Sequence, residues 1–182
     1  FQTFRFFPHK TDSEGLFVAI ARKSKSTTQR TPKARKRVVQ EIDKTARKEL
    51  QRWLNEPEKH SFAMIADTIY AYRTEQYKAI QSLSENLTAI YSGVAMGQLF
   101  KGRLKPEHAL ALYVGRNDAV VSVVEVSEED AVNYLRKQDI AAAQFEEGIN
   151  VVSYRGVAIG FIKRIGARCN NMYPKDLRIQ KL

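Results

Sequence analysis

Two short apolar segments on either side of Arg155-Gly156 constrain the fold of this chain more than any other feature. Residues 149–154 and 157–162 are rich in valine and isoleucine. A two-residue break that contains glycine between such segments is typical of a β-hairpin. Residues 119–126 have the same composition and predict a further strand. We therefore expect residues 100–182 to form a block rich in β-structure.

Helices are predicted from capping residues and from helical spacing. Ser127 precedes three acidic residues in the form of a capping box, and this pattern predicts a helix that ends near Arg136-Lys137. A short helix is expected from Pro106 to Leu112. Thr31-Pro32 predicts the start of a longer helix, which Asn55 and Pro57 end. Its apolar positions recur at helical spacing: Val38, Ile42, Ala46, Leu50, Trp53 and Leu54.

Residues 62–99 mix short elements. Strands are expected over residues 62–65, 68–72, 87–91 and 94–99, and a helix over residues 74–83. Residues 24–31 contain no apolar residue and predict a linker.

The N-terminal residues predict a hairpin with no visible cover. Residues 4–7 and 16–21 are the expected strands, with a polar loop between them. The second strand is almost continuously apolar, and such strands are usually covered on both faces. We therefore expect the edge of a sheet whose other strands lie elsewhere. Because the chain begins with Phe1 and not with Met, we also expect it to be a piece of a longer protein.

The charge distribution indicates a polyanionic partner. The net charge is +10, and it is concentrated in two blocks. Residues 22–59 hold 13 Lys/Arg against 5 Asp/Glu, and residues 155–181 hold 7 against 1. Nucleic acid is the most common partner of such a chain. A basic surface that is merely solvated is the alternative.

Signals for catalysis are scarce. The histidines His9, His60 and His108 lack metal-ligand spacing, and a single cysteine builds neither a zinc site nor a disulfide. Cys169 lies between Arg168 and Asn170, which allows a lowered thiol pKa, but an ordinary half-buried cysteine is the favoured interpretation. The lone cysteine fits a reducing compartment, and neither a membrane span nor a signal peptide is visible. We expect a cytoplasmic protein.

Cations, amides and an aromatic residue alternate over residues 160–179. Lysine and arginine bind phosphate, asparagine can contact a base edge, and tyrosine can stack on an unpaired base. The alternative is a C-terminal barrel strand in which Asn170 and Asn171 form a turn and Tyr173-Pro174 packs beneath the sheet. Composition does not separate the two hypotheses.

Four ordered segments carry a family resemblance. They are Gly97-Gln-Leu-Phe-Lys-Gly-Arg-Leu-Lys-Pro-Glu-His-Ala-Leu-Ala-Leu112, Ala131-Val-Asn-Tyr-Leu-Arg136, Gly160-Phe-Ile-Lys-Arg164 and Asn170-Asn-Met-Tyr-Pro-Lys-Asp-Leu-Arg-Ile179. Together they resemble the PUA-like RNA-binding domain that ends the RsmF-type rRNA cytosine-C5 methyltransferases of bacteria, in the Nol/Nop/Sun family. The N-terminal hairpin is similar to the last two strands of that family's Rossmann-like catalytic core.

The resemblance implies an α+β fold in three parts. Residues 1–24 would be terminal strands of the methyltransferase core, and residues 25–97 a basic linker, a helix and a small mixed α/β domain. Residues 98–182 would be a PUA-like β-barrel with peripheral helices. The family's Pro-Cys motif and its Gly-rich S-adenosylmethionine site do not occur in this sequence. No catalytic or cofactor residue is therefore assigned here, and S-adenosylmethionine is expected only for the parent enzyme.

The function that the resemblance implies is to position rRNA for methylation by the parent enzyme. The chain is expected to be a monomer that binds rRNA or a ribosomal subunit and no membrane. The predicted RNA-binding residues are Lys101, Arg103, Lys105, Lys163, Arg164, Arg168, Asn170, Asn171, Tyr173, Lys175 and Arg178. Two alternatives are a stand-alone RNA- or ribosome-binding module without catalysis, and a protein-interaction domain whose basic surface is incidental.

Overall fold

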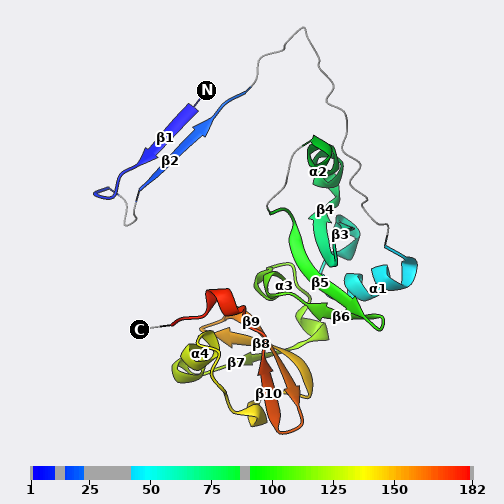
Figure 1. The fold of residues 1–182 in the computed structure, drawn as a ribbon, viewed down its shortest axis with the longest axis vertical. Coiled ribbons are helices and arrows are strands. Elements are labelled where there is room, and N and C mark those ends of the chain that lie inside the picture. Colours follow the sequence, from blue (N-terminus) through cyan, green and yellow to red (C-terminus); the bar gives the residue numbers. More distant parts are fainter. Residues whose placement is uncertain (1, 11–14, 23–41, 87–90, 181–182) are drawn as a thin grey trace. The chain divides into compact units, whose positions relative to one another are not determined.

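A computed structural model describes residues 2–10, 15–22, 42–86 and 91–180 (Figure 1). The chain divides into two units, Phe1–Lys33 and Ala34–Leu182, and each is described by itself. Among the helices of the described residues, none is both long and apolar enough to cross a membrane.

The first unit contains the predicted N-terminal hairpin. Strand β1 (Gln2–Phe6) pairs antiparallel with β2 (Leu16–Ile20), and Phe4 lies opposite Val18. Its large apolar side chains are between 40% and 60% exposed: Phe4, Phe6, Phe7, Leu16, Phe17 and Ile20. The hairpin thus shows the uncovered apolar surface that the sequence predicts.

The first sheet of the second unit is antiparallel and four-stranded. Its order is β3-β4-β5-β6, formed by β3 (His60–Ile65), β4 (Thr68–Arg73), β5 (Val94–Phe100) and β6 (Arg103–Pro106). Helix α1 (Lys44–Arg52) and the 3-10 turn η1 (Pro57–Lys59) precede it. Helix α2 (Thr74–Asn86) follows β4. The division expected between residues 97 and 98 falls inside β5.

A second four-stranded sheet follows, in the order β10-β9-β8-β7. It consists of β7 (Ser122–Glu125), β8 (Gly148–Tyr154), β9 (Val157–Ile165) and β10 (Arg168–Asn171). Strands β7 and β8 are parallel, and the other pairs are antiparallel. The hairpin predicted around Arg155-Gly156 is confirmed, and both turn residues have positive φ, at 51° and 75°.

Short helices surround the second sheet. Helix α3 (His108–Leu112) contacts both β5 and β9 and so joins the two sheets, as Figure 1 shows. Helix α4 (Glu128–Leu135) begins as predicted, because the Ser127 hydroxyl accepts a hydrogen bond of 3.1 Å from the Asp130 amide. Three 3-10 turns complete the unit: η2 (Asp118–Val120), η3 (Ala142–Gln144) and η4 (Lys175–Leu177).

The expected closed β-barrel is not seen in the described residues. Each sheet is open, since the strand pairing of one ends at β3 and β6 and that of the other at β7 and β10. The architecture is mixed α/β, with two open sheets and short helices. The origin of the N-terminal hairpin in a Rossmann-like sheet stays a prediction.

Alternation along the central strands places apolar residues in two separate cores. Val151 and Phe161 lie in a core shared with α1, α3 and the first sheet, whereas Val152 and Ile162 lie in a core under α4. Both faces of the second sheet are therefore covered, which explains the continuous apolar runs that its strands show.

Two predicted elements are corrected by local hydrogen bonding. The long helix expected from Thr31-Pro32 is not continuous through residues 42 and 43. Helix α1 starts after Asp43, whose carboxylate accepts bonds of 2.8 Å from the amides of Thr45 and Ala46. The predicted start itself lies outside the described residues, as does most of the strand expected at 87–91. The strand expected over residues 119–126 is shorter, because Asn117 caps the η2 turn before β7.

Candidate nucleic-acid interface

A groove of about 1420 Å³ runs between the β5–β6 hairpin and the exposed end of strands β9 and β10. Both walls belong to the second unit. Helix α1 contributes Arg52 and Trp53, and the segment before β8 contributes Glu146 and Glu147. Five of the predicted RNA-binding residues line it: Lys101, Arg103, Lys105, Lys163 and Asn170.

One wall of the groove is the basic β5–β6 hairpin. Phe100 lies opposite Arg103, so Lys101-Gly102 forms a two-residue turn, and positive φ angles of 50° and 75° fit a type I′ turn. Along β6, Leu104 is buried while Arg103 and Lys105 are exposed. Strand alternation thus presents the two cations together on the outer surface.

Glu49 ties this hairpin to helix α1. Its carboxylate accepts hydrogen bonds from the Leu104 amide at 3.2 Å and from the Trp53 indole at 3.4 Å, and it pairs with Arg52 at 3.0 Å. Part-buried hydrogen bonds of Glu49 thus connect β6 to helix α1.

The opposite wall comes from β9 and β10. Lys163 lies directly across from Asn170 on β10 and from Ile149 on β8, and all three line the groove. Arg168 lies two residues before Asn170 on β10. Its side chain therefore points to the same face of the sheet as Asn170 and Lys163. It does not itself line the groove.

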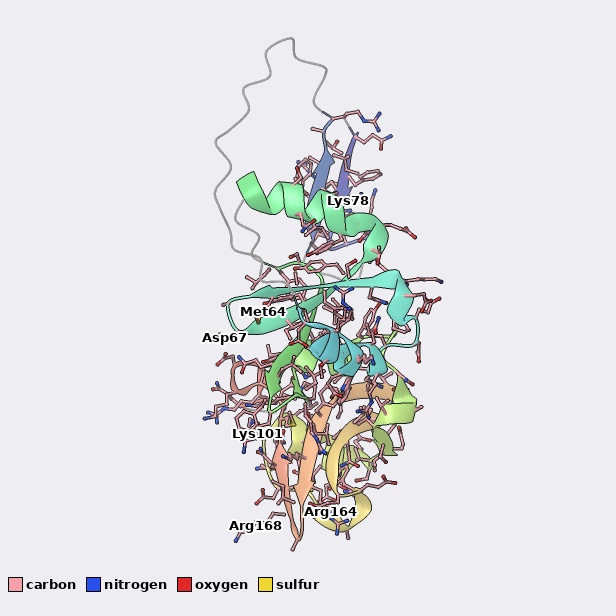
Figure 2. The ribbon with its side chains drawn as sticks, turned by 90° about the vertical axis from the view of Figure 1, so that its right-hand side faces the viewer. Met64, Asp67, Lys78, Lys101, Arg164 and Arg168 are labelled. Atoms are coloured by element: carbon pink, nitrogen blue, oxygen red, sulfur yellow. The ribbon has the colours of Figure 1, made fainter. Side chains whose placement is uncertain are left out.

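Arg164 points to the other face of the sheet, away from Lys163. Its guanidinium donates to the carbonyl oxygens of Gly166 at 2.9 Å and Phe145 at 2.5 Å. Figure 2 shows Arg164 on the side of the segment that contains η3 and Arg168 on the opposite side of the β9–β10 hairpin. The neighbours Lys163 and Arg164, grouped by the sequence, are therefore separated by the pleat of the strand.

Asn171 and Tyr173 make internal contacts. The Asn171 side chain donates to the Tyr134 carbonyl at 2.8 Å and accepts from the Tyr173 amide at 2.9 Å. The Tyr173 ring packs edge-on against His108 and Tyr134, with centroid distances of 5.1 and 5.5 Å. The packing of Tyr173 matches the alternative that the sequence left open, whereas Asn170 and Asn171 lie in β10 and not in the turn that this alternative expected. Asn170, in contrast, is exposed in the groove.

The remaining predicted cations lie beyond the groove. Lys175 belongs to η4 and Arg178 follows it, and both side chains are exposed. Burial, and then the nearby charge of Lys175, lower the pKa of Lys137, whose ammonium group donates to the Asn171 and Tyr173 carbonyls. The C-terminal segment is thus held against α4 by hydrogen bonds.

The charges of the groove are mixed, but four of its cations form no ion pair with any described residue. Five acidic residues also line it: Glu49, Glu107, Asp118, Glu146 and Glu147. Glu49 pairs with Arg52, and Asp118 pairs at 2.8 Å with the buried Arg116. Within the described part of the chain, Lys101, Arg103, Lys105 and Lys163 form no ion pair. These four are available to an anionic ligand.

Cys169 does not have the features of a reactive thiol. It is half-buried against the core under α4, and this burial raises its pKa, although the charge of Arg164 acts in the opposite direction. The ordinary half-buried cysteine that the sequence favoured is therefore the interpretation that the structure supports. Across the described ranges, no group of three His, Cys, Asp or Glu side chains is arranged to hold a metal ion.

Comparisons with known proteins relate this chain to one family. Residues 121–179 match the family model described as the methyltransferase RsmF PUA domain. The region that matches this PUA domain contains β7 to β10 and α4, whereas the β5–β6 wall of the groove precedes it in the chain.

Whole-chain relatives carry the name ribosomal RNA small subunit methyltransferase F. The protein of Shewanella piezotolerans is 25% identical over 184 residues, which cover 97% of this chain and 38% of the relative. That of Aliivibrio fischeri is 26% identical over 183 residues, which cover 94% and 37%. The chain therefore spans less than two fifths of the length of these curated relatives.

Two residues of the groove were missed from the sequence. Arg52 belongs to α1, far from the C-terminal motif in the chain, and its side chain reaches the groove only through tertiary packing. Phe100 was assigned to no site, although its position beside the Lys101-Gly102 turn is a sequence signal for an exposed aromatic residue.

Proposed function

We propose that this chain is the RNA-binding part of an S-adenosylmethionine-dependent rRNA cytosine-C5 methyltransferase. Its groove would hold structured rRNA while a catalytic domain, to which the β1–β2 hairpin would belong, transfers the methyl group. The match to the RsmF PUA domain and the name of the relatives support ribosomal RNA as the class of ligand. The S-adenosylmethionine site would lie in that catalytic domain and not in this chain.

One observation supports this proposal most: cations from two parts of the second unit line one groove, and none of them has an ion-pair partner among the described residues. Lys101, Arg103 and Lys105 come from the β5–β6 hairpin, and Lys163 comes from β9 in the region that matches the PUA domain. Side chains of this kind bind phosphates largely independently of sequence and position the nucleic acid. Asn170, which lies beside Lys163, would contact a base or a ribose hydroxyl.

A salt titration with rRNA fragments of the small subunit tests the proposal. The logarithm of the association constant should fall linearly with the logarithm of salt concentration, with a slope of about −0.7 to −0.9 for each phosphate neutralised. A fourfold variant, K101Q/R103Q/K105Q/K163Q, should lose most of this slope and bind much more weakly. The unchanged chain should also bind rRNA better than a non-nucleic polyanion such as heparin.

A second fourfold variant is the matched control. K44Q/R47Q/K48Q/K78Q removes the same charge from exposed positions of α1 and α2 that do not line the groove. If both variants weaken binding equally, the groove is not the site and only the net charge matters. A flat salt response in the unchanged chain would favour the protein-interaction alternative.

A further inference from the structure

Phe100 is a large aromatic side chain that the structure keeps out of both cores. It is the last residue of β5 and is 68% exposed, while its neighbour Leu99 packs against the first core. It also lines the groove. An exposed phenylalanine beside unpaired cations calls for a physical explanation.

A bulge in β5 accounts for this orientation. Ile69 pairs with Gly97 but Tyr70 pairs with Ala95, so one residue of β5 is extra at this point. Val94 faces the first core before the bulge, Met96 faces it at the bulge, and Leu99 faces it afterwards. A regular strand would instead continue the core face at even-numbered positions and would bury Phe100.

Gly97 makes the bulge possible. Its φ is 130°, and a Cβ atom there would lie 2.1 Å from the Lys105 carbonyl oxygen. The close approach of β5 and β6 at this point therefore depends on a glycine. The same backbone feature turns Phe100 outward and fixes the start of the basic hairpin.

Cations border the ring on two sides. The Lys101 ammonium lies 5.6 Å from the ring centroid, and Arg103 is the cross-strand partner of Phe100. On the PUA-domain wall, Ile165 also lines the groove and is 57% exposed. Aromatic faces surrounded by phosphate-binding cations are the usual platforms for unpaired bases, because every base has a π-face and every nucleotide a phosphate.

We infer that the groove takes RNA with an unpaired nucleotide, whose base stacks on Phe100 while adjacent phosphates bind Lys101 and Arg103. This inference rests on the proposed function and narrows its ligand from rRNA in general to a loop, bulge or single strand. Tyr173, the aromatic residue expected in this role from the sequence, is packed between His108 and Tyr134. Phe100 takes its place.

The test compares two RNA probes with the 182-residue chain and with Phe100 variants. The probes are a stem with an unpaired loop and a blunt duplex with the same number of phosphates, measured at one salt concentration. The unchanged chain should prefer the loop. Phe100→Ala should weaken loop binding roughly 5- to 150-fold, the range for the loss of one base–aromatic stack, and leave duplex binding unchanged. Phe100→Trp should retain loop binding, and Phe100→Leu should lose it despite its apolar side chain.

Val114→Ala is the control for loss of exposed apolar surface. Val114 is 96% exposed and does not line the groove, so this variant should bind both probes like the unchanged chain. Equal binding of loop and duplex, or unchanged loop binding by Phe100→Ala, would overturn the inference while leaving the groove as the RNA site. Full RNA binding by K101Q/R103Q/K105Q/K163Q would instead overturn the proposed function.

Discussion

A Cβ atom on Gly160 would lie 2.1 Å from the hydroxyl oxygen of Tyr134. The same hydroxyl donates a hydrogen bond of 2.8 Å to the carbonyl oxygen of Phe161. Helix α4 therefore packs against strand β9 so closely that the Tyr134 hydroxyl leaves no space for a side chain at position 160. Burial of the Tyr134 side chain, together with the nearby Tyr173, raises the pKa of its phenol well above the ordinary value, so it stays a donor.

Replacement of Gly160 should destabilise the PUA domain through this contact. Gly160→Ala inserts a methyl group into a filled space at φ 152°, and we expect a loss of about 1–3 kcal/mol in the free energy of unfolding. Urea denaturation measures it. In the double variant G160A/Y134F the loss should be smaller than the sum of the two single losses, since the clashing oxygen is gone. Additive losses would show that the contact is not the cause.

The Asp43 cap predicts a second stability effect. Asp43→Ala removes both hydrogen bonds to the first turn of α1, and the free energy of unfolding should fall by about 1 kcal/mol. Asp43→Asn retains an accepting oxygen and should lose much less. If the alanine and asparagine variants unfold at the same urea concentration, the cap does not stabilise the helix.

Substitution of Lys163 should change RNA affinity, whereas substitution of its neighbour Arg164 should change stability. Lys163→Gln should lower RNA affinity and reduce the salt slope by about 1, with no change in stability. Arg164→Gln removes two bonds to backbone carbonyls and should lower stability by about 1–2 kcal/mol while leaving the RNA affinity of the folded protein unchanged. Binding titrations and urea denaturation of the same preparations compare the two. Equal effects of both variants on RNA affinity would contradict the assignment of the two faces.

His108 predicts a pH dependence of stability. Burial lowers its pKa below the ordinary value of 6.5, against a smaller opposing effect of Glu107. The unfolded chain then binds the proton more readily than the folded chain. Protonation of His108 therefore lowers the free energy of unfolding as the pH falls from 6.5 towards the pKa of the folded state. Well above pH 6.5 the group has no such effect. His108→Gln should therefore weaken the fall in stability between pH 7.5 and pH 5.5. An identical pH profile for both proteins would rule out this role for His108.

Local signals in the sequence were sufficient for most elements. The Arg155-Gly156 turn and the Ser127 cap act within four residues of themselves, so hairpin and helix follow from neighbouring side chains alone. Where a local signal was overlooked, the prediction failed. The Asp43 side chain competes for the amides of the next turn and starts a new helix inside the longer one that the apolar spacing suggested.

The sequence by itself determined the hairpin strands, the α4 cap, the basic character of the C-terminal part and its family resemblance. Each of these depends on residues that lie close together in the chain. Only the tertiary structure decided which cations share a surface. The pleat of β9 sends Lys163 to the groove and Arg164 to the opposite face, and the bulge at Gly97 turns Phe100 outward. The physical reason is register: a shift of one residue reverses every side chain of a strand, and register is fixed by pairing with distant strands.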